Sequence, residues 1–324
     1  MNTENKADRS AVLSLQPDFM PMVISGEKKE QNGEDSCFCA LEKQAALIGV
    51  YDGSGGSGAR TYPEFGGKTG AYIASRAAAE GTFAWFRRWM KAGPDAPLST
   101  DDLMQEISNV LGIWHEATES QSMLKSSLTR EFPTTFAGEV VLPDEEEQKL
   151  KVCFLWSGDS RCYVMDKSGL HQVSVDDLAV TDALQNLTED APMRNVISAS
   201  HPYKINERRL KIRKPCVLFT ATDGCFGYLK SPMEFERLLI ETLAGAKCAD
   251  GWRTALGEAF RGTAGDDFTL CALPFGFGSF ENLQAFFAER LQVLKEKYFI
   301  PESGDPEVIR SRWELYRKEY ERYQ

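Results

Sequence analysis

The stretch that most constrains the fold of this chain covers residues 45–58, AALIGVYDGSGGSG. A mostly apolar run leads into Asp52, and a glycine-rich loop follows at once. This order predicts a buried strand that ends by presenting a carboxylate, beside a loop open enough for a ligand to approach the backbone.

Three further apolar runs carry an acid at one end. The run VLFTATDG ends at Asp223, and VCFLWSGDSR contains Asp159. In GDDFTLCAL the order is reversed, and Asp266 and Asp267 precede the strand-like residues. Acids gathered at strand ends repel one another and are costly to desolvate unless cations are present. Carboxylate oxygens suit Mg²⁺ or Mn²⁺ better than zinc, so the four runs predict a site for such ions.

Composition excludes several classes of function. The chain has 324 residues, enough for one large domain or two small ones, and a net charge of −11. That charge argues against nucleic acid as a partner, because phosphate backbones require a basic surface. No apolar run approaches the roughly 20 residues that span a bilayer. The eight cysteines form no CxxC pair, which is typical of reduced thiols. We therefore expect a cytoplasmic protein with no membrane partner.

The order of the elements indicates an α+β fold. Periodicity predicts helices over residues 69–90, 99–125, 231–246 and 252–260. The third has Ser231 as its cap and proline at its first position. Short strand-like runs precede the first helix pair, separate the two pairs and follow the second, whereas residues 208–214 form a basic segment. We therefore predict antiparallel sheets rather than alternating βαβ units.

The chain divides into a main domain over residues 1–278, with residues 1–15 flexible, and a helical extension over residues 279–324. Apolar residues recur on one face of the extension's first helix. Our favoured interpretation is a helical hairpin packed on the body or on itself. An arm that docks a partner protein is the alternative.

Three patterns suggest other functions and are discounted. Residues 53–58 match GxGxxG, but no helix begins within the motif to receive a dinucleotide. Gly67-Lys68-Thr69 resembles a phosphate loop without its earlier glycine, although it could cap a helix. Asp-Gly is a common hairpin dipeptide, yet a loop and a helix, rather than a strand, follow it both times. The histidines lie in unrelated contexts, so none is assigned a role.

Taken together, the motifs resemble those of the metal-dependent serine/threonine protein phosphatases of the type 2C (PPM) family. IGVYDGSGG, SGDSR, MRNVISA, TATDG and GDDFTL occur in the family's order, with NGEDS in the place of its N-terminal acids. The resemblance covers roughly residues 19–275. It implies a four-layer α-β-β-α sandwich of two antiparallel sheets flanked by helices, with metal ions at one sheet edge.

The resemblance also implies roles for individual residues. Asp52 would bridge two Mn²⁺ or Mg²⁺ ions, one of which the Gly53 carbonyl helps to hold. The remaining ligands would be acids of the other motifs: Glu34 for one ion, Asp223 and Asp266 for the other, and Asp159 with Asp223 for a third ion seen in some members. Asp35 would occupy an outer position. Asp52, Asp223 and Asp266 would form the catalytic set, although Asp266 and Asp267 are ambiguous by one residue.

The implied reaction is hydrolysis of phosphoserine or phosphothreonine in a protein substrate by a metal-activated water, opposing a serine/threonine kinase. Two departures from the family pattern stand out. Glu30 occupies the place of the arginine that grips phosphate, so Lys28 or Lys29, of which we assign Lys29, would substitute. Ser54 replaces a histidine or methionine. These departures motivate the alternative, a catalytically weak or inactive relative that binds phosphoproteins as a regulator.

Overall fold

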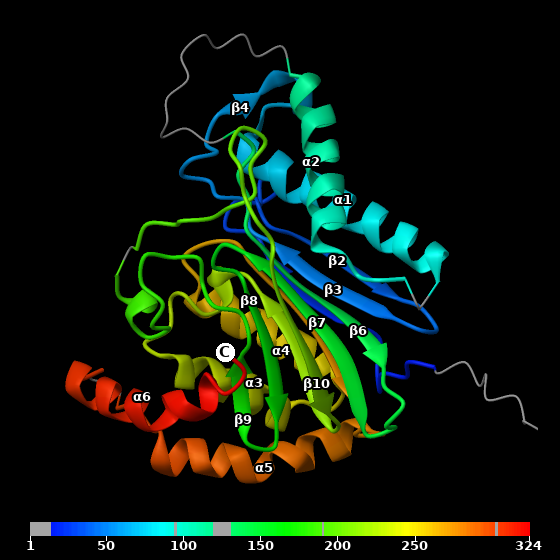
Figure 1. Cartoon of the computed structure of the whole chain (residues 1–324). Coiled ribbons are helices and arrows are strands. Elements are labelled where there is room, and N and C mark those ends of the chain that lie inside the picture. The colour runs from blue at the N-terminus through cyan, green and yellow to red at the C-terminus, as the bar shows by residue number, and fades with distance from the viewer. Residues whose placement is uncertain (1–13, 94–95, 119–130, 190, 302–303) are drawn as a thin grey trace, which may run out of the picture.

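The computed structural model describes residues 14–93, 96–118, 131–189, 191–301 and 304–324. Within them, two antiparallel sheets of five strands each lie face to face, and helices cover their outer faces (Figure 1). These layers confirm the predicted α+β sandwich.

Each sheet is built from strands that are distant in the sequence. The β11 sheet has the order β1 (Met22–Gly26), β12 (Phe268–Phe275), β11 (Cys216–Ala221), β8 (Arg161–Asp166) and β9 (Gly169–Gln172). The β3 sheet has the order β10 (Asn206–Arg213), β7 (Lys149–Ser157), β6 (Phe136–Pro143), β3 (Ala46–Tyr51) and β2 (Ser36–Leu41). A short hairpin of β4 (Thr61–Tyr62) and β5 (Lys68–Thr69) lies outside both sheets.

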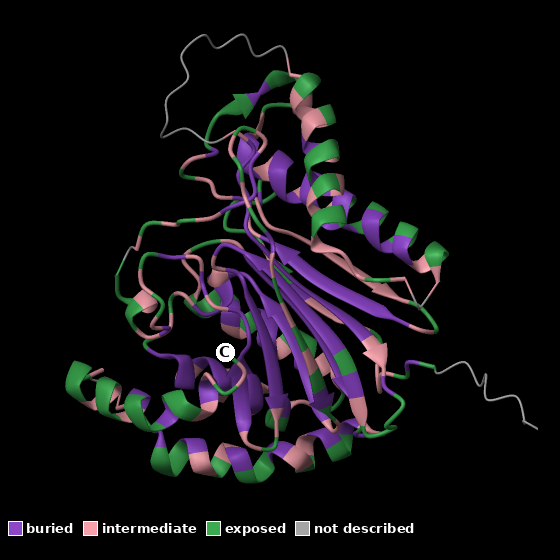
Figure 2. Cartoon of the chain, viewed as in Figure 1, coloured by how far each residue is buried: buried purple, intermediate pink, exposed green. Residues whose placement is uncertain are grey.

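The helices form the outer layers. On the β3 sheet lie α1 (Gly70–Ala92) and α2 (Thr100–Glu116), and on the β11 sheet lie α3 (Pro232–Gly245) and α4 (Ala249–Thr263). Figure 2 shows the strands largely buried and the helices exposed on their outer sides. Across the described ranges, every helix is too short or too polar to pass through a bilayer.

Local sequence explains where the helices begin. Thr69 caps α1, because its hydroxyl accepts a hydrogen bond from the Tyr72 amide at 3.1 Å. Ser231 does the same for α3, followed by Pro232 at the first position. Both predicted caps are confirmed. The second helix ends at Glu116, and the rest of its predicted range partly lies outside the described residues.

Residues 208–214 proved to be more than a basic segment. They supply most of β10, which pairs with β7 at the edge of the β3 sheet. Its side chains alternate between exposed and partly buried, and charged side chains are well suited to an edge strand. The charge of the segment had obscured its alternating pattern.

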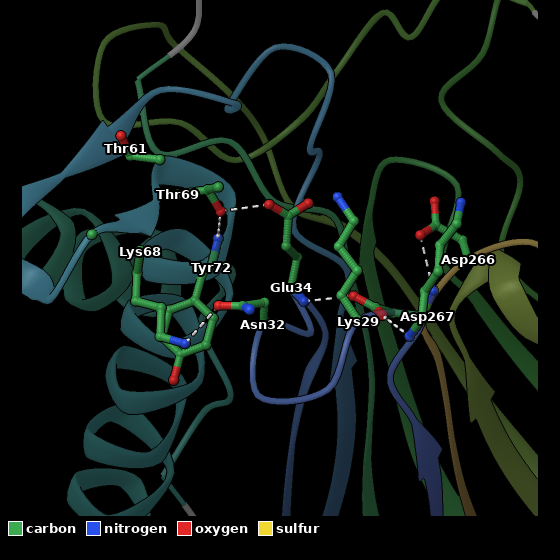
Figure 3. A pocket seen from close by; sticks show the side chains of 11 residues that line it. Lys29, Asn32, Glu34, Thr61, Lys68, Thr69, Tyr72, Asp266 and Asp267 are labelled. Carbon is green, nitrogen blue, oxygen red and sulfur yellow. Dashed lines mark hydrogen bonds between the residues drawn. The ribbon is translucent and has the colours of Figure 1, made fainter.

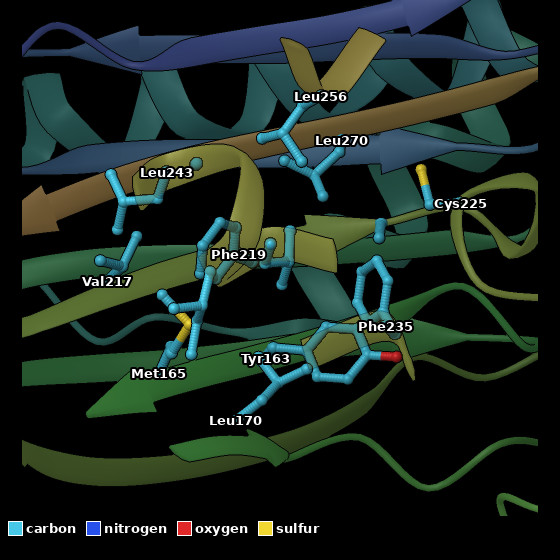
Figure 4. Packing of buried hydrophobic residues seen from close by; sticks show 14 of the residues in the cluster. Tyr163, Met165, Leu170, Val217, Phe219, Cys225, Phe235, Leu243, Leu256 and Leu270 are labelled. Carbon is cyan, nitrogen blue, oxygen red and sulfur yellow. The ribbon is translucent and has the colours of Figure 1, made fainter. Parts of the chain in front are cut away.

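The β11 sheet is buried on both faces. Phe219 lies among Leu243 of α3 and Leu256 of α4 on the helical side (Figure 4). Its neighbour Leu218 faces the β3 sheet instead, as the two-residue period of a strand requires. This burial on both faces accounts for the nearly continuous run of apolar residues in the sequence of the strand.

The C-terminal helices pack on the body of the protein. The helix α5 (Phe280–Lys297) contacts α3, and α6 (Pro306–Tyr320) contacts β9. Tyr316 and Tyr320 join the same buried cluster as Phe219. These contacts agree with the interpretation favoured from the sequence, whereas the domain boundary at residue 278 and the docking of a partner stay predictions.

Candidate active site

Strand pairing brings the predicted acids to one edge of the sandwich. In the β3 sheet, Ser36 of β2 pairs with Tyr51 of β3. Asp35 directly precedes the first residue of that pair and Asp52 directly follows the second. Because the two strands are antiparallel, the two acids leave the sheet at the same end.

The β11 sheet repeats this arrangement. Ala221 of β11 pairs with Arg161 of β8, so Asp223, two residues after β11 ends, lies beside Asp159, two residues before β8 begins. Three of the four apolar runs that mark the sequence therefore deliver carboxylates to a common place. We call Asp35, Asp52, Asp159 and Asp223 the acid cluster.

The acid cluster is held together against its own repulsion. The carboxyl groups of Asp52 and Asp223 are hydrogen-bonded to each other. Desolvation and the charge of Asp223 raise the pKa of Asp52 well above its ordinary value. A shared proton between two carboxyl groups is the expected result when no cation balances them.

The other two members are also poorly solvated. Desolvation raises the pKa of Asp35 to about 8, although Thr222 donates a hydrogen bond to it at 2.8 Å. Desolvation and the charge of Asp223 raise the pKa of Asp159 to about 8. The Oδ1 atom of Asp159 is covered and has no hydrogen-bond partner. An orphaned carboxylate oxygen beside two other acids is suited to receive a cation.

Glu34 and Asp266 lie on the outer side of the cluster, at a cavity of about 390 Å³ (Figure 3). The Thr69 hydroxyl donates a hydrogen bond to Glu34, and burial raises the pKa of this glutamate. The charge of Asp266 acts on both Glu34 and Asp223. Asp267 likewise acts on Glu34 and on Asp35, so the two adjacent aspartates both connect the cavity electrostatically with the acid cluster.

The geometry separates the roles of the two adjacent aspartates. The carboxylate of Asp267 accepts hydrogen bonds from the amides of Lys28 and Glu34, both at 2.6 Å. It ties the turn between β1 and β2 to the start of β12. Asp266 is exposed, and its carboxylate accepts a hydrogen bond only from the adjacent Asp267 amide among the described contacts. This division favours Asp266 over Asp267 as a ligand.

Positive charge in the cavity comes from lysines. Lys28, Lys29 and Lys68 line its wall, and in Figure 3 the Lys29 side chain extends alongside Glu34. Lys68 donates to the backbone carbonyl of Gln31 and to the Asn32 side chain, the latter at 3.0 Å. Its ammonium also lies 4.7 Å from the centre of the Tyr72 ring.

One glycine of the motifs is required by close approach of the backbone. A Cβ at Gly224 would lie 1.8 Å from the carbonyl oxygen of Asp267. The loop that carries Asp223 is thereby pressed against the loop that carries Asp266. The Asp223–Cys225 segment is a 3₁₀ turn rather than a hairpin, so the predicted Asp-Gly pair serves packing and not strand reversal.

A second cavity, of about 380 Å³, is lined by Asp223 and Asp159 themselves. Its wall includes a buried ion pair in which Arg161 contacts Asp176 at 2.7 Å. Asn186 also donates to Asp176, at 3.0 Å, and the Arg161 guanidinium lies 4.1 Å from the centre of the Phe226 ring. The arginine of SGDSR therefore anchors the irregular segment that borders the acids.

Sequence reasoning assigned Lys68 and Thr69 no part in the site beyond a possible helix cap, and it did not find the pair of Arg161 with Asp176. Lys68 and Thr69 belong to the discounted phosphate-loop pattern, and their position at the start of α1 was the available signal. Nothing local indicated the partner of Arg161, because Asp176 lies in a segment without periodicity.

We asked whether these residues fit divalent cations. Throughout the part of the chain that the structure describes, no three His, Cys, Asp or Glu side chains are arranged to hold a metal ion as they stand. The donors nevertheless fit in kind: they are carboxylates, poorly solvated, mutually repelling, and one oxygen of Asp159 lacks a partner. Asp52, Asp159 and Asp223 fit best, whereas Glu34 is engaged by Thr69.

Comparison with known families identifies the chain. A family model described as protein phosphatase 2C matches residues 25–261, most of the β-sandwich. The chain therefore belongs to the protein phosphatase 2C family. A comparison with curated proteins finds no match.

Solved structures agree in fold. The serine/threonine phosphatase Stp1 from Staphylococcus aureus has a TM-score of 0.56 and 15% identity, over 82% of this chain and 97% of that one. The phosphatase PstP/Ppp from Mycobacterium tuberculosis has a TM-score of 0.53 and 15% identity, over 78% and 97%. A structure of the PstP catalytic domain in complex with 2 manganese ions has a TM-score of 0.50 and 15% identity, over 78% and 96%. At these identities the likeness shows the fold alone.

Proposed function

We propose that the protein is a divalent-metal-dependent phosphatase that hydrolyses phosphoserine and phosphothreonine in proteins and opposes a serine/threonine kinase. The observation that carries the proposal is the acid cluster, in which desolvated carboxyl groups from both sheets meet and repel one another. Membership of the protein phosphatase 2C family and the manganese in the PstP structure support the same conclusion.

The acids would hold two Mn²⁺ or Mg²⁺ ions, or three. Asp52 and Asp223 provide the central carboxylates, the Gly53 carbonyl and Glu34 contribute on one side, and Asp266 and Asp159 on the other. When bound, such ions activate water for attack on phosphorus and stabilise the charge of the phosphoryl group.

The chain's own residues position the ligands and the substrate. Asp35 accepts a hydrogen bond from Thr222, which directly precedes Asp223, and so orients the loop of that ligand. Lys29, with Lys28 and Lys68, offers positive charge to the phosphate in place of an arginine. A lysine acts as a point charge rather than a bidentate fork, so it neutralises the phosphate without fixing its orientation.

The proposal is tested by hydrolysis of p-nitrophenyl phosphate and of a phosphothreonine peptide, with Mn²⁺ and with chelator. We expect activity only with the metal, and its loss in Asp223→Asn. Asp250→Asn is the matched control, because Asp250 lies on α4 with 87% of its side chain exposed. Hydrolysis that survives the chelator, or full activity in Asp223→Asn, would overturn the proposal.

Metal binding has a readout that is independent of turnover. Mn²⁺ should raise the midpoint of thermal unfolding, since a ligand that binds only the folded state stabilises it. Protons compete for carboxyl groups whose pKa is about 8. The shift should therefore be larger at pH 8 than at pH 5. Equal shifts at both pH values would indicate binding elsewhere.

A second candidate is a non-catalytic relative that binds phosphoproteins. Glu30 in the arginine position and the engagement of Glu34 by Thr69 favour it. Calorimetric titration with the phosphothreonine peptide distinguishes the two candidates. Binding that persists in Asp223→Asn, with no phosphate released by either form, would establish this function instead.

A further inference from the structure

Three cysteines lie together between the two sheets. Cys37 and Cys39 are on β2, on the face that packs against the β11 sheet, and Cys271 is on β12. The sulfur atoms of Cys39 and Cys271 are 3.5 Å apart. Cys37 is also hydrogen-bonded to Cys271. All are free thiols in this structure.

Cys39 and Cys271 differ in their exposure to solvent, although their sulfur atoms are in contact. The strand β2 is the outermost strand of the β3 sheet, and Cys39 is partly exposed, whereas Cys271 is fully buried. Cys39 is therefore the more solvent-accessible residue of the two, and the Cys271 sulfur is in contact with its own. Sulfur atoms in a disulfide are about 2.05 Å apart, so the bond requires an approach of only about 1.5 Å.

We propose that Cys39 and Cys271 form a reversible disulfide that joins the two sheets when the protein meets a peroxide. The proposal concerns a covalent modification and is independent of the phosphatase activity. It rests on the contact between the Cys39 and Cys271 sulfur atoms across the two sheets.

The reaction balances in two steps. The Cys39 sulfur, as thiolate, attacks one peroxide oxygen, the O–O bond breaks, and the departing hydroxide takes up a proton to become water. Cys39 is then a sulfenic acid. The Cys271 sulfur attacks it, the S–O bond breaks, and the hydroxyl leaves as water with the thiol proton. Two thiols lose two electrons and two protons in total, and the peroxide is reduced to two waters.

A disulfide between Cys39 and Cys271 would affect the stability of the fold, because it would join β2 to β12. The strand β2 begins directly after Asp35, and β12 begins directly after Asp267. Asp267 already links the two segments through its hydrogen bond from the Glu34 amide. A covalent bond between residues 39 and 271 would close a long loop of chain, which constrains the unfolded state most effectively.

The test uses the full chain, reduced and then treated with hydrogen peroxide. After free thiols are blocked, peptide mapping without reductant should recover a peptide containing Cys39 linked to one containing Cys271. Thermal unfolding of the oxidised protein should shift upward by about 5 °C and return on addition of dithiothreitol. Both effects should vanish in Cys39→Ser, whose site is partly exposed, and in Cys271→Ala.

Cys248→Ser is the matched control, because Cys248 is exposed at the start of α4 and serine suits that capping position. This variant should behave as the parent does. The proposal is overturned if Cys39 and Cys271 remain reduced, if Cys37 rather than Cys39 pairs with Cys271, or if the thermal shift persists in Cys39→Ser. Far-UV circular dichroism verifies that each variant is folded before oxidation.

Discussion

The protein buries carboxyl groups in two places. In one place they lie beside other carboxyl groups, and in the other the carboxylate is paired with an arginine. At the edge of the sandwich, Asp52 and Asp223 meet each other, and their neighbours in the acid cluster add further negative charge. Below the β11 sheet, the fully buried Glu236 of α3 meets Arg290 of α5 at 2.7 Å. The Tyr316 hydroxyl of α6 also donates to Glu236 at 2.5 Å.

The difference between the two sites distinguishes a buried carboxylate that supports the fold from carboxyl groups suited to a functional role. Glu236 has a counter-charge and a full set of hydrogen bonds, so removal of either partner would damage the fold. Among the described residues the acid cluster forms no ion pair, and the charge of Arg161, which lowers the pKa of Asp159 and Asp223, is outweighed by desolvation. The cluster therefore destabilises the protein unless further positive charge is supplied. Ionisable groups that destabilise the fold are expected at functional sites, where activity depends on them.

The largest effect on stability is expected at the buried ion pair of Glu236 with Arg290. Arg290→Leu should lower the free energy of unfolding by about 3–5 kcal/mol, because it leaves Glu236 buried without a positive partner. Urea denaturation measures the change. Arg253→Leu, which breaks the exposed contact with Asp250, is the control and should change the value by less than about 0.5 kcal/mol. Equal effects in the two variants would break the comparison.

A smaller effect is expected at Asp166, whose contribution to stability depends on pH. Burial raises the pKa of Asp166, but hydrogen bonds from His171 and Ser168 outweigh it and lower that pKa to about 2. A depressed pKa stabilises the folded state above the ordinary value of 3.8, and this stability is lost as pH falls toward 2.

Asp166→Asn should therefore be less stable than the parent at pH 6, by on the order of 2 kcal/mol. The gap between the two proteins should close as pH falls from about 4 to about 2. Denaturation with urea across this range measures both. A gap that does not depend on pH would show that Asp166 acts through packing and not through its charge.

The acid cluster should respond in the opposite direction. In the absence of metal, Asp52→Asn removes a carboxyl group that must take up a proton or carry a buried charge when the chain folds. The free energy of unfolding should therefore rise by about 1 kcal/mol at pH 8. Denaturation in the presence of a chelator measures it, with Asp166→Asn as the comparison of opposite sign. A loss of stability in Asp52→Asn would mean that the cluster is not strained by its own charge.

The smallest effect is expected at the cavity lysines. Lys29→Gln should raise KM for the phosphothreonine peptide by about 2–5-fold with little change in kcat, since Lys29 is exposed and an exposed charge contributes about 0.5–1 kcal/mol. Lys43→Gln, an exposed residue between β2 and β3, is the control. A fall in kcat with unchanged KM would place Lys29 in the reaction rather than in phosphate binding.

Much of the site could be predicted because Asp52, Asp223 and Asp266 lie next to strands that are buried along their whole length. Apolar text before Asp52 and Asp223, and after Asp266, indicates strands whose ends must lie at a sheet edge. The helix caps at Thr69 and Ser231 were predictable for a similar reason, since capping depends on residues two or three apart. These features are local, and the sequence carries them without reference to the rest of the chain.

Other features required the packed chain. Lys68 enters the cavity because the hairpin of β4 and β5 places it against the turn before β2. Arg161 meets Asp176, and Cys39 meets Cys271, across 15 and 232 positions of sequence. No periodicity or dipeptide preference encodes such distances.

The sequence by itself determined which residues end strands, which cap helices, and that several carboxylates would stand at sheet edges, because these depend on short-range sterics and on burial of alternating side chains. Tertiary structure alone decided which acids meet one another, that Asp267 braces a turn while Asp266 faces the solvent, and which charges find partners. The reason is that Coulomb energy and hydrogen bonding depend on distance in space, and in this fold that distance is set by two sheets packing together.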